Sequence, residues 1–326
     1  MNDTMNEREL SLALKEIEKK FGKQTFNQTE SFSNEVISTG SILLDKATGV
    51  NGFPKGKIIE IYGNESSGKS TIALQVVREC INNNGNVAYI DLENSLDKKY
   101  LDSLGIDASK VLIANPEYGE QAFSIIEALL KTEMIDLIVV DSVAAMVPKS
   151  DMDASIEDQS MGTHARLMSK GLKIIQPAIA KSNTCVIFIN QIREKIGVVF
   201  GNNEITTGGR ALKFFSCLRL DVRRSELLKN GNDIIGIKSK IVITKNKVGI
   251  PFKSCFVDIF FNQGFNPFKE IIDFAIQYDI IQKSGSWFYY DKQKIGQGRN
   301  NLENYLANNN ELFETIKSLV LQKITN

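Results

Sequence analysis

The chain has 326 residues, of which 42% are hydrophobic and 24% are charged, and its 39 basic side chains balance its 39 acidic ones. This composition is typical of a soluble globular protein of about two domains, and it excludes a disordered or collagenous chain. The formal net charge of zero neither favours nor excludes nucleic acid as a partner.

Cysteine spacing, the histidine count and the length of apolar stretches argue against a metal or redox site, a catalytic triad and a membrane protein. The four cysteines, at positions 80, 185, 217 and 255, are too far apart for a CxxC pair, so we expect buried, reduced thiols. His164 is the only histidine, which leaves a histidine metal site or a Ser-His-Asp triad without partners. Because no apolar stretch approaches the ~18 residues that span a bilayer, we expect a cytoplasmic protein with no membrane partner.

Residues 6–22 predict an amphipathic helix whose apolar positions fall on one face. These positions are Leu10, Ala13, Leu14, Ile17 and Phe21. The polar stretch 23–35 that follows is typical of a linker. The apolar stripe needs cover, either from the body of its own chain or from a neighbouring subunit, and the pattern favours neither.

Short β-rich segments alternate with helical ones from about residue 57 to 260. Near-continuous apolar segments predict strands at 57–63, 86–91, 110–114, 136–141 and 184–190, with helical patterns at 69–82 and 119–132. Buried strands separated by helices indicate an α/β protein whose parallel sheet is covered on both faces. We expect three later strands to extend this sheet in antiparallel fashion, at 217–224, 236–246 and 254–261.

The pattern changes near residue 268. Helical segments are predicted at 268–278, 299–307 and 310–323, around a small hairpin at 287–295. The chain therefore divides into a helix with its linker at 1–35, an α/β core at 36–267 and a small α+β domain at 268–326.

The segment GNESSGKS at 63–70 matches the phosphate-loop pattern G-x-x-x-x-G-K-[ST] in full, between a predicted strand and a predicted helix. Gly63 and Gly68 let the backbone N–H groups wrap around phosphate oxygens. Lys69 would bridge the β- and γ-phosphates, and the Ser70 hydroxyl would ligate Mg²⁺, so we expect ATP and Mg²⁺. The expected nucleotide contacts are Gly63, Asn64, Glu65, Ser66, Ser67, Gly68, Lys69, Ser70 and Thr71.

Two carboxylates are candidates for the chemistry. Asp141 ends the apolar segment DLIVVD and would hold Mg²⁺ through its water shell, although a strand-end Asp can also cap the next turn. Glu93 lies just past the strand at 86–91, at the edge where ligands of open α/β sheets bind. We expect Glu93 to activate the attacking water, with Asp91 as the alternative in the same segment. A further alternative is that Glu93 is a surface residue without a catalytic role.

A Gly-, Asn- and Thr-rich stretch follows the predicted strand that ends at Gln191. We expect a long loop that resumes order near Ala211, and long loops of this kind are commonly functional. Gln191 would hydrogen-bond the γ-phosphate and report it to the loop. The loop combines basic side chains with an aromatic one, which is typical of nucleic-acid binding, whereas a disordered surface loop is the alternative.

A series of segments far more specific than the phosphate loop resembles the bacterial RecA recombinase family over nearly the full chain. The segments are ISTGS (37–41), IEIYGNESSGKST (59–71), IDLENSLD (90–97), IVVDSVAAMVPKS (138–150), MGTHARLMS (161–169), SNTCVIFINQIREKIGVVFGN (182–202), TTGGRALKFF (206–215), RLDVRR (219–224), TKNKVGIPFK (244–253) and KIGQG (294–298). The resemblance implies a RecA-like P-loop NTPase core with a mostly parallel sheet. It also implies an N-terminal helical arm for polymerisation at 1–35 and a small α+β C-terminal domain.

Carried over by position, the resemblance assigns roles at the nucleotide. Glu93 corresponds to the catalytic glutamate, Gln191 to the switch between ATP and DNA, and Lys69 to the phosphate-loop lysine. Tyr100 corresponds to the aromatic residue that packs near the adenine. Lys245 and Lys247 correspond to lysines that reach the ATP of the neighbouring protomer, and their spacing places both on one face of a strand.

The resemblance also assigns two DNA-binding loops, 151–162 and 192–208. The DNA-facing positions are Met161, Arg166, Arg193, Phe200, Gly208, Gly209 and Arg210. The first loop is strongly acidic, so its contacts should come from backbone amides or Met161. An acidic C-terminal tail common in the family is missing, and we expect easier loading on duplex DNA as a result.

The implied activity is that of a DNA-dependent ATPase that forms ATP-bound filaments on single-stranded DNA. Such a filament pairs homologous double-stranded DNA and exchanges strands in recombinational repair, and the resemblance adds a self-cleaving repressor of a DNA-damage response as a further partner. The alternative is a ring-forming P-loop DNA motor or helicase. That class shares residues 63–70 and Asp141 but lacks the arm and the segment at 206–215.

Overall fold

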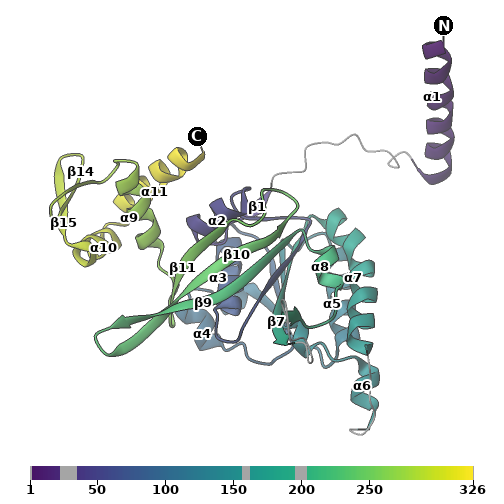
Figure 1. Ribbon diagram of the computed structural model, residues 1–326, viewed down its shortest axis with the longest axis horizontal. Coiled ribbons are helices and arrows are strands. Elements are labelled where there is room, and N and C mark those ends of the chain that lie inside the picture. Colours follow the sequence, from purple (N-terminus) through teal and green to yellow (C-terminus); the bar gives the residue numbers. More distant parts are fainter. Residues whose placement is uncertain (1, 23–34, 156–161, 195–203, 326) are drawn as a thin grey trace. The chain divides into compact units, whose positions relative to one another are not determined.

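The computed structural model describes residues 2–22, 35–155, 162–194 and 204–325 (Figure 1). The chain divides into two units, Met1–Glu35 and Val36–Asn326. The described residues of the first unit form the helix α1 (Asn2–Phe21), as the apolar periodicity predicts. Leu10 and Phe21 of α1 are 60% and 68% exposed, so the helix by itself does not bury its apolar stripe.

The second unit is built on one large sheet. Its strands are β3 (Ile58–Gly63), β4 (Val87–Asp91), β5 (Val111–Ala114), β6 (Leu137–Asp141), β7 (Cys185–Glu194), β8 (Glu204–Thr206), β9 (Leu218–Asn230), β10 (Asp233–Asn246), β11 (Ser254–Phe260) and β12 (Gly264–Phe265). The spatial order is β12-β11-β10-β9-β3-β7-β6-β4-β5, with β8 paired to β7 off this path. The strand that carries the phosphate loop, β3, is therefore central.

Helices cover both faces of this sheet, as the apolar strands require. The principal helices of the core are α3 (Lys69–Asn82), α5 (Gly119–Lys131) and α7 (Thr163–Ser182). Neighbouring strand residues point to opposite faces: Ile138 and Val140 pack with α5 and α7, whereas Leu137 and Val139 pack in the cluster that contains α3. Figure 1 shows α3 on one side of the sheet and α5 with α7 on the other. The mostly parallel α/β fold expected from the sequence is confirmed.

One strand direction differs from expectation. β9 pairs parallel with β3, so the antiparallel part of the sheet begins only at β10. The reason is the connection, because the chain leaves β7, passes through β8 and the short helix α8 (Ala211–Phe215), and enters β9 in the same direction as β3. β10, β11 and β12 then pair in antiparallel fashion as expected.

The C-terminal residues form an α+β arrangement with its own apolar cluster. Its elements are α9 (Pro267–Gln277), β13 (Gln282–Ser284), β14 (Trp287–Tyr290), β15 (Gln293–Gln297), α10 (Arg299–Asn308) and α11 (Asn310–Thr325). The expected hairpin is present and gains a third strand, β13, on its outer side. The remaining short elements are β1 (Val36–Ile37), α2 (Ile42–Thr48), β2 (Phe53–Pro54), α4 (Lys98–Ser103), the 3-10 helices Ala108–Lys110 and Val143–Ala145, and α6 (Lys149–Asp153).

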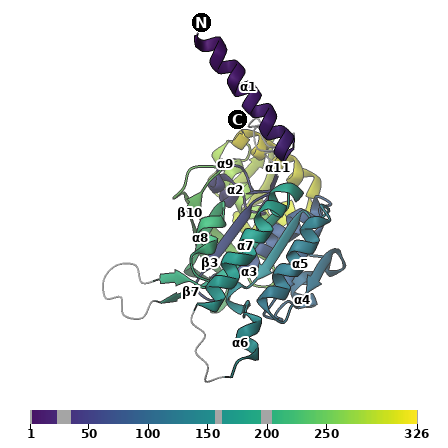
Figure 2. The same ribbon diagram turned by 90° about the vertical axis from the view of Figure 1, so that its right-hand side faces the viewer.

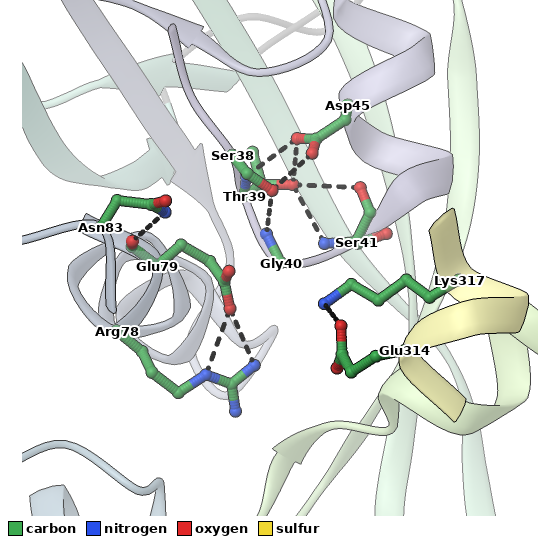
Figure 3. Close-up of polar contacts among 10 residues, drawn as sticks. All are labelled: Ser38, Thr39, Gly40, Ser41, Asp45, Arg78, Glu79, Asn83, Glu314 and Lys317. Carbon is green, nitrogen blue, oxygen red and sulfur yellow. Dashed lines mark hydrogen bonds and ion pairs between the residues drawn. The ribbon is translucent and has the colours of Figure 1, made fainter. Parts of the chain in front are cut away.

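A buried carboxylate organises the ISTGS turn between β1 and α2 (Figure 3). Asp45 accepts hydrogen bonds from the Ser38 hydroxyl at 2.7 Å and from the Thr39 backbone N–H at 2.8 Å. Ser41 caps α2 and donates its hydroxyl to Glu270 of α9 at 2.7 Å. The turn therefore joins the core to the C-terminal helices through side-chain hydrogen bonds.

The four cysteines are buried and unbridged, as expected. Burial raises the pKa of the Cys80 and Cys255 thiols to about 12, which keeps both thiols protonated and unreactive near neutral pH. Within the described parts of the chain, every helix is too short or too polar to cross a membrane.

Candidate functional site

The phosphate loop joins the carboxyl end of β3 to the first turn of α3. A Cβ at Gly63 would lie 2.0 Å from the Val222 carbonyl oxygen, so only glycine fits where β3 and β9 meet. Gly68, which precedes α3, has a φ of 95°, a left-handed conformation that glycine adopts without strain. The loop thus presents the N-terminus of a 14-residue helix, where backbone N–H groups and the helix dipole favour an anion.

Lys69 is buried within this loop. Its Nζ donates a hydrogen bond to the backbone carbonyl of Asn64 at 2.7 Å. Burial lowers the pKa of Lys69, while the charges of Asp141, Glu93 and Glu65 oppose that shift. A buried ammonium that donates to a neutral carbonyl is well placed to donate instead to charged phosphate oxygens, which are stronger acceptors.

Asp141 ends β6 beside the start of α3. Its Oδ2 accepts a hydrogen bond from the Tyr89 hydroxyl at 2.7 Å, and the Ser70 hydroxyl also bonds to this carboxylate. Burial raises the pKa of Asp141, so a cation at this position would restore its charged form. In the described residues no group of three or more His, Cys, Asp or Glu side chains could hold a metal. One carboxylate and one hydroxyl suit Mg²⁺, which takes its other ligands from phosphates and water.

The two candidate catalytic carboxylates have different surroundings. The Asp91 carboxylate is buried and accepts the backbone N–H groups of Glu93 at 3.2 Å and Leu96 at 2.9 Å, so it folds the turn after β4. Glu93 is exposed, and its Oε1 accepts the Ser142 hydroxyl at 2.5 Å. Ser142 directly follows Asp141, and the spacing of motifs gave no signal for this contact. Glu93 thus lies beside Ser142, and its charge acts on Lys69 of the phosphate loop, whereas Asp91 is held by the backbone of its own turn.

Tyr100 lies beside the first turn of α3. Its hydroxyl shares a hydrogen bond of 2.9 Å with the hydroxyl of Thr71. The structure thus brings Tyr100 to the phosphate loop across 29 residues of sequence.

Gln191 lies directly beside the phosphate loop, because β3 and β7 pair with Gly63 opposite Gln191. Its backbone carbonyl accepts the Thr207 N–H at 3.2 Å, and the preceding Asn190 amide donates to Glu60 at 2.9 Å and to the Thr207 carbonyl at 3.1 Å. These bonds connect the end of β7 with the segment at 207 and with β3.

The predicted bounds of the long loop after Gln191 are wrong at both ends. β7 continues to Glu194, and β8 begins at Glu204 and pairs with it in antiparallel fashion (Figure 2). Glu204–Thr206 already form a strand before Ala211, because backbone ladder bonds with β7 hold this segment. Met161 and Phe200 lie outside the described residues, as do residues 156–161 of the first predicted DNA-binding loop and 195–203 of the second.

The remaining predicted DNA-binding residues come from three segments: α7, β7 and the turn before α8. A Cβ at Gly209 would lie 2.8 Å from the Ala165 Cβ, and one at Gly208 would lie 2.9 Å from the Met168 Cγ, so this turn packs against the start of α7. Arg166 on α7 and Arg193 on β7 are exposed. Arg193 and Arg210 line a cavity of about 760 Å³ next to this turn. The first residue of the acidic segment, Asp151, also contacts the start of α7, because it accepts the Thr163 hydroxyl at 2.6 Å.

Lys245 and Lys247 do not share a strand face as their spacing predicts. β10 ends at Asn246 and its register shifts before Lys245, so only Lys245 belongs to the strand. Lys245 Nζ donates to the carbonyls of Lys213 at 2.6 Å and Phe214 at 2.9 Å, at the end of α8. Burial, with the nearby charge of Lys247, lowers the pKa of Lys245 to about 8. Lys247 is exposed.

Comparisons with known proteins cover nearly the whole chain. A family model for the RecA N-terminal domain matches residues 8–266, and one for the RecA C-terminal domain matches residues 269–325. Protein RecA of Malacoplasma penetrans is 71% identical over 99% of this chain and 98% of its own length. Protein RecA of Bacillus subtilis is 48% identical over 95% of this chain and 90% of its own length.

A solved structure is similar in fold. The crystal structure of the RadB recombinase has a TM-score of 0.53, with 23% identity over 70% of this chain and 97% of that chain. At this identity the likeness concerns the α/β fold alone.

Proposed function

The chain belongs to the RecA family, and we propose that it is a DNA-dependent ATPase that forms ATP-bound filaments on single-stranded DNA and exchanges strands with homologous duplex. Recombination with ATP and DNA as ligands is the general activity of this family. The observation that carries the finer proposal is the pairing of Gly63 with Gln191. It places the end of the phosphate-loop strand beside the strand that leads into the β7–β8 hairpin.

ATP binds to the loop at 63–70, with Lys69 at its phosphates and Tyr100 beside Thr71 at the adenine end. When bound, Mg²⁺ would neutralise part of the phosphate charge, and Ser70 and Asp141 are the protein oxygens that would hold it. Lys69 gives up the Asn64 carbonyl and donates to phosphate oxygens instead. This exchange replaces a neutral acceptor by a charged one, so it favours the bound state.

Glu93 accepts the proton of the attacking water. Its carboxylate lies at the carboxyl edge of the sheet, and the hydrogen bond of 2.5 Å from Ser142 fixes its orientation. Asp91 supports this position by holding the backbone N–H of Glu93. A base that is oriented before the substrate arrives contributes to the rate without a reorganisation cost in the transition state.

Gln191 connects hydrolysis to DNA. Its side chain would bond the γ-phosphate, and its backbone already bonds Thr207, next to the Gly208–Gly209 turn. Loss of the γ-phosphate would then loosen the segments that hold DNA, an order–disorder switch of the kind that nucleotide-binding proteins use. Arg166, Arg193 and Arg210 supply charge for the DNA backbone, so pairing rather than base readout tests homology.

Filament growth requires a surface that receives the arm. β5 is the last strand at one end of the described sheet, and its Leu112 is 57% exposed, as is Met134 at 69%. Both side chains border a cavity of about 590 Å³. We assign this edge as the seat of α1 from a neighbouring copy, with Lys245 and Lys247 reaching the neighbour's ATP. Activation of repressor self-cleavage by this filament is part of the proposal and rests on the family resemblance.

The deciding experiment measures ATP hydrolysis with and without single-stranded DNA, for the wild type and for Lys69→Ala. We expect strong stimulation by DNA in the wild type and none in the variant, because Lys69 is the phosphate-binding ammonium. A hydrolysis rate that does not change with DNA would contradict the proposed link between hydrolysis and DNA through Gln191. It would favour a ring-forming motor.

A further inference from the structure

One arginine outside the nucleotide loop and the DNA-binding positions joins the two. Arg223 lies on β9, one residue after Val222, which pairs with Gly63 of β3. Its Nη1 and Nη2 donate to the two carboxylate oxygens of Glu204 at 2.8 and 2.6 Å. Its Nε and Nη2 donate to Asp221 at 2.5 and 3.1 Å, and its Nη1 also reaches the Asn64 side-chain oxygen at 3.4 Å. A guanidinium has five N–H donors, and these bonds occupy all of them.

Asn64 is the point where this arginine meets the nucleotide site. Its backbone carbonyl accepts Lys69 Nζ at 2.7 Å, while its side-chain oxygen accepts Arg223. A continuous chain of polar contacts therefore runs from Lys69 through Asn64 and Arg223 to Glu204. Its far end, Glu204, is the first residue of β8 and pairs with Glu194 of β7.

The contact between Arg223 and Glu204 is stronger than an ordinary surface ion pair. The pair is bidentate, and the two side chains are only 29% and 33% exposed. The hydrogen bonds to Glu204 and Asp221 raise the pKa of Arg223, and the bond to Arg223 lowers the pKa of Glu204. Bidentate geometry and a shared network are the conditions under which such pairs fix a conformation.

We propose that Arg223 is a positioning residue that couples the phosphate loop to the β7–β8 hairpin, through Asn64 on one side and Glu204 on the other. The inference rests on the proposed function, since it requires ATP at the loop and DNA at the hairpin. Phosphate oxygens draw Lys69 away from the Asn64 carbonyl. Asn64 then shifts relative to Arg223, and the bidentate pair passes that shift to the start of β8. This route is separate from Gln191, which acts at the end of β7.

The test compares single-stranded DNA affinity with a non-hydrolysable ATP analogue and without nucleotide, using a fluorescent oligo-dT and the full chain. Arg223→Lys keeps the positive charge but loses the planar fork, and Glu204→Gln removes the partner without removing any basic residue. Arg224→Lys, at the exposed next position of β9, is the matched control. Thermal unfolding checks each variant, and Glu204→Gln alone decides the test if Arg223→Lys does not fold.

We expect the ratio of the two affinities to fall at least about fivefold in Arg223→Lys and Glu204→Gln, a modest coupling for two sites. Arg224→Lys keeps the wild-type ratio.

A ratio within about twofold of wild type in both single variants would overturn the coupling role. An arginine that only touches DNA gives that result, because Arg223→Lys retains the charge and Glu204→Gln changes both affinities alike. The wild-type measurement distinguishes a failure of the coupling role from a failure of the proposed function. If nucleotide leaves wild-type DNA affinity unchanged, the proposed function is contradicted, and the inference that rests on it is contradicted too.

Discussion

At the scale of single residues, Gln191 is the position where one side chain would report on the nucleotide. It stands beside Gly63 in the β3–β7 ladder, and its backbone bonds Thr207. We predict that Gln191→Ala still binds ATP but loses the stimulation of hydrolysis by single-stranded DNA, since the backbone contacts remain while the amide is lost. Hydrolysis assays with and without DNA, beside binding of a fluorescent ATP analogue, measure both properties. Wild-type stimulation in the variant would contradict the switch role.

Asp45 makes a second prediction at this scale, in the pH dependence of stability. Burial raises the pKa of Asp45 from 3.8 to about 6 against the opposing hydrogen bonds of Ser38 and Thr39, with a smaller contribution from Glu270. Because the folded state holds the proton more tightly, the stability linked to Asp45 is present below the unfolded pKa and is lost as pH rises through about 6.

Asp45→Asn mimics the protonated form and keeps an acceptor for Thr39. We therefore expect the free energy of unfolding of wild type to fall relative to Asp45→Asn by roughly 3 kcal/mol between about pH 4 and 7, as the pKa difference implies. Denaturant unfolding at several pH values measures the difference. A difference that stays constant with pH would show that Asp45 does not titrate in this range.

At the scale of elements, the turn at Gly208–Gly209 fixes how the β7–β8 hairpin meets α7. Gly209 has a φ of 76°, and an added Cβ would lie 2.8 Å from the Ala165 Cβ. Gly209→Ala therefore combines left-handed strain with a clash against the helix. We predict weaker single-stranded DNA binding and a loss of stability larger than the about 1–2 kcal/mol of left-handed strain alone.

Gly231→Ala is the matched control for this turn. Gly231 has a φ of 61°, and an added Cβ meets nothing within 4 Å, so the substitution carries the backbone strain without a clash. Thermal unfolding and DNA titration of both variants separate the two effects. Equal losses of DNA affinity in the two variants would mean that the contact between the turn and α7 has no role in DNA binding.

At the scale of the whole molecule, we expect filament growth to depend on two apolar surfaces, one on α1 and one at β5. Leu10 of α1 is 60% exposed and Leu112 of β5 is 57% exposed. We predict that Leu10→Glu and Leu112→Glu each shorten filaments strongly, because a charge at an apolar interface loses its water without gaining a partner. Electron microscopy and sedimentation with single-stranded DNA and a non-hydrolysable ATP analogue measure filament length.

Leu227→Glu on β9 is the control for filament growth, since Leu227 is 43% exposed and lies away from β5 in the strand order. It should leave filament length unchanged. If Leu112→Glu filaments are as long as those of Leu227→Glu, the β5 edge is not the seat of the arm.

The sequence alone determined the features that depend on short-range spacing. The phosphate loop was predictable because Gly63, Gly68, Lys69 and Ser70 act within one loop whose geometry their spacing sets. The positions of β3, β4, β6 and α3 followed from local apolar patterns, as did the N-terminal helix and the C-terminal α+β part. Such signals arise from neighbours in the chain, and they are therefore visible without a structure.

Tertiary structure alone decided which distant residues meet. The direction of β9, the pairing of β8 with β7 after Gln191, and the different surroundings of Asp91 and Glu93 all depend on strand pairing and burial. Arg223 reaches Asn64 across 159 residues only because β9 lies next to β3 in the sheet. No local spacing encodes that contact, since the order of strands is settled by packing of the whole core on both faces of the sheet.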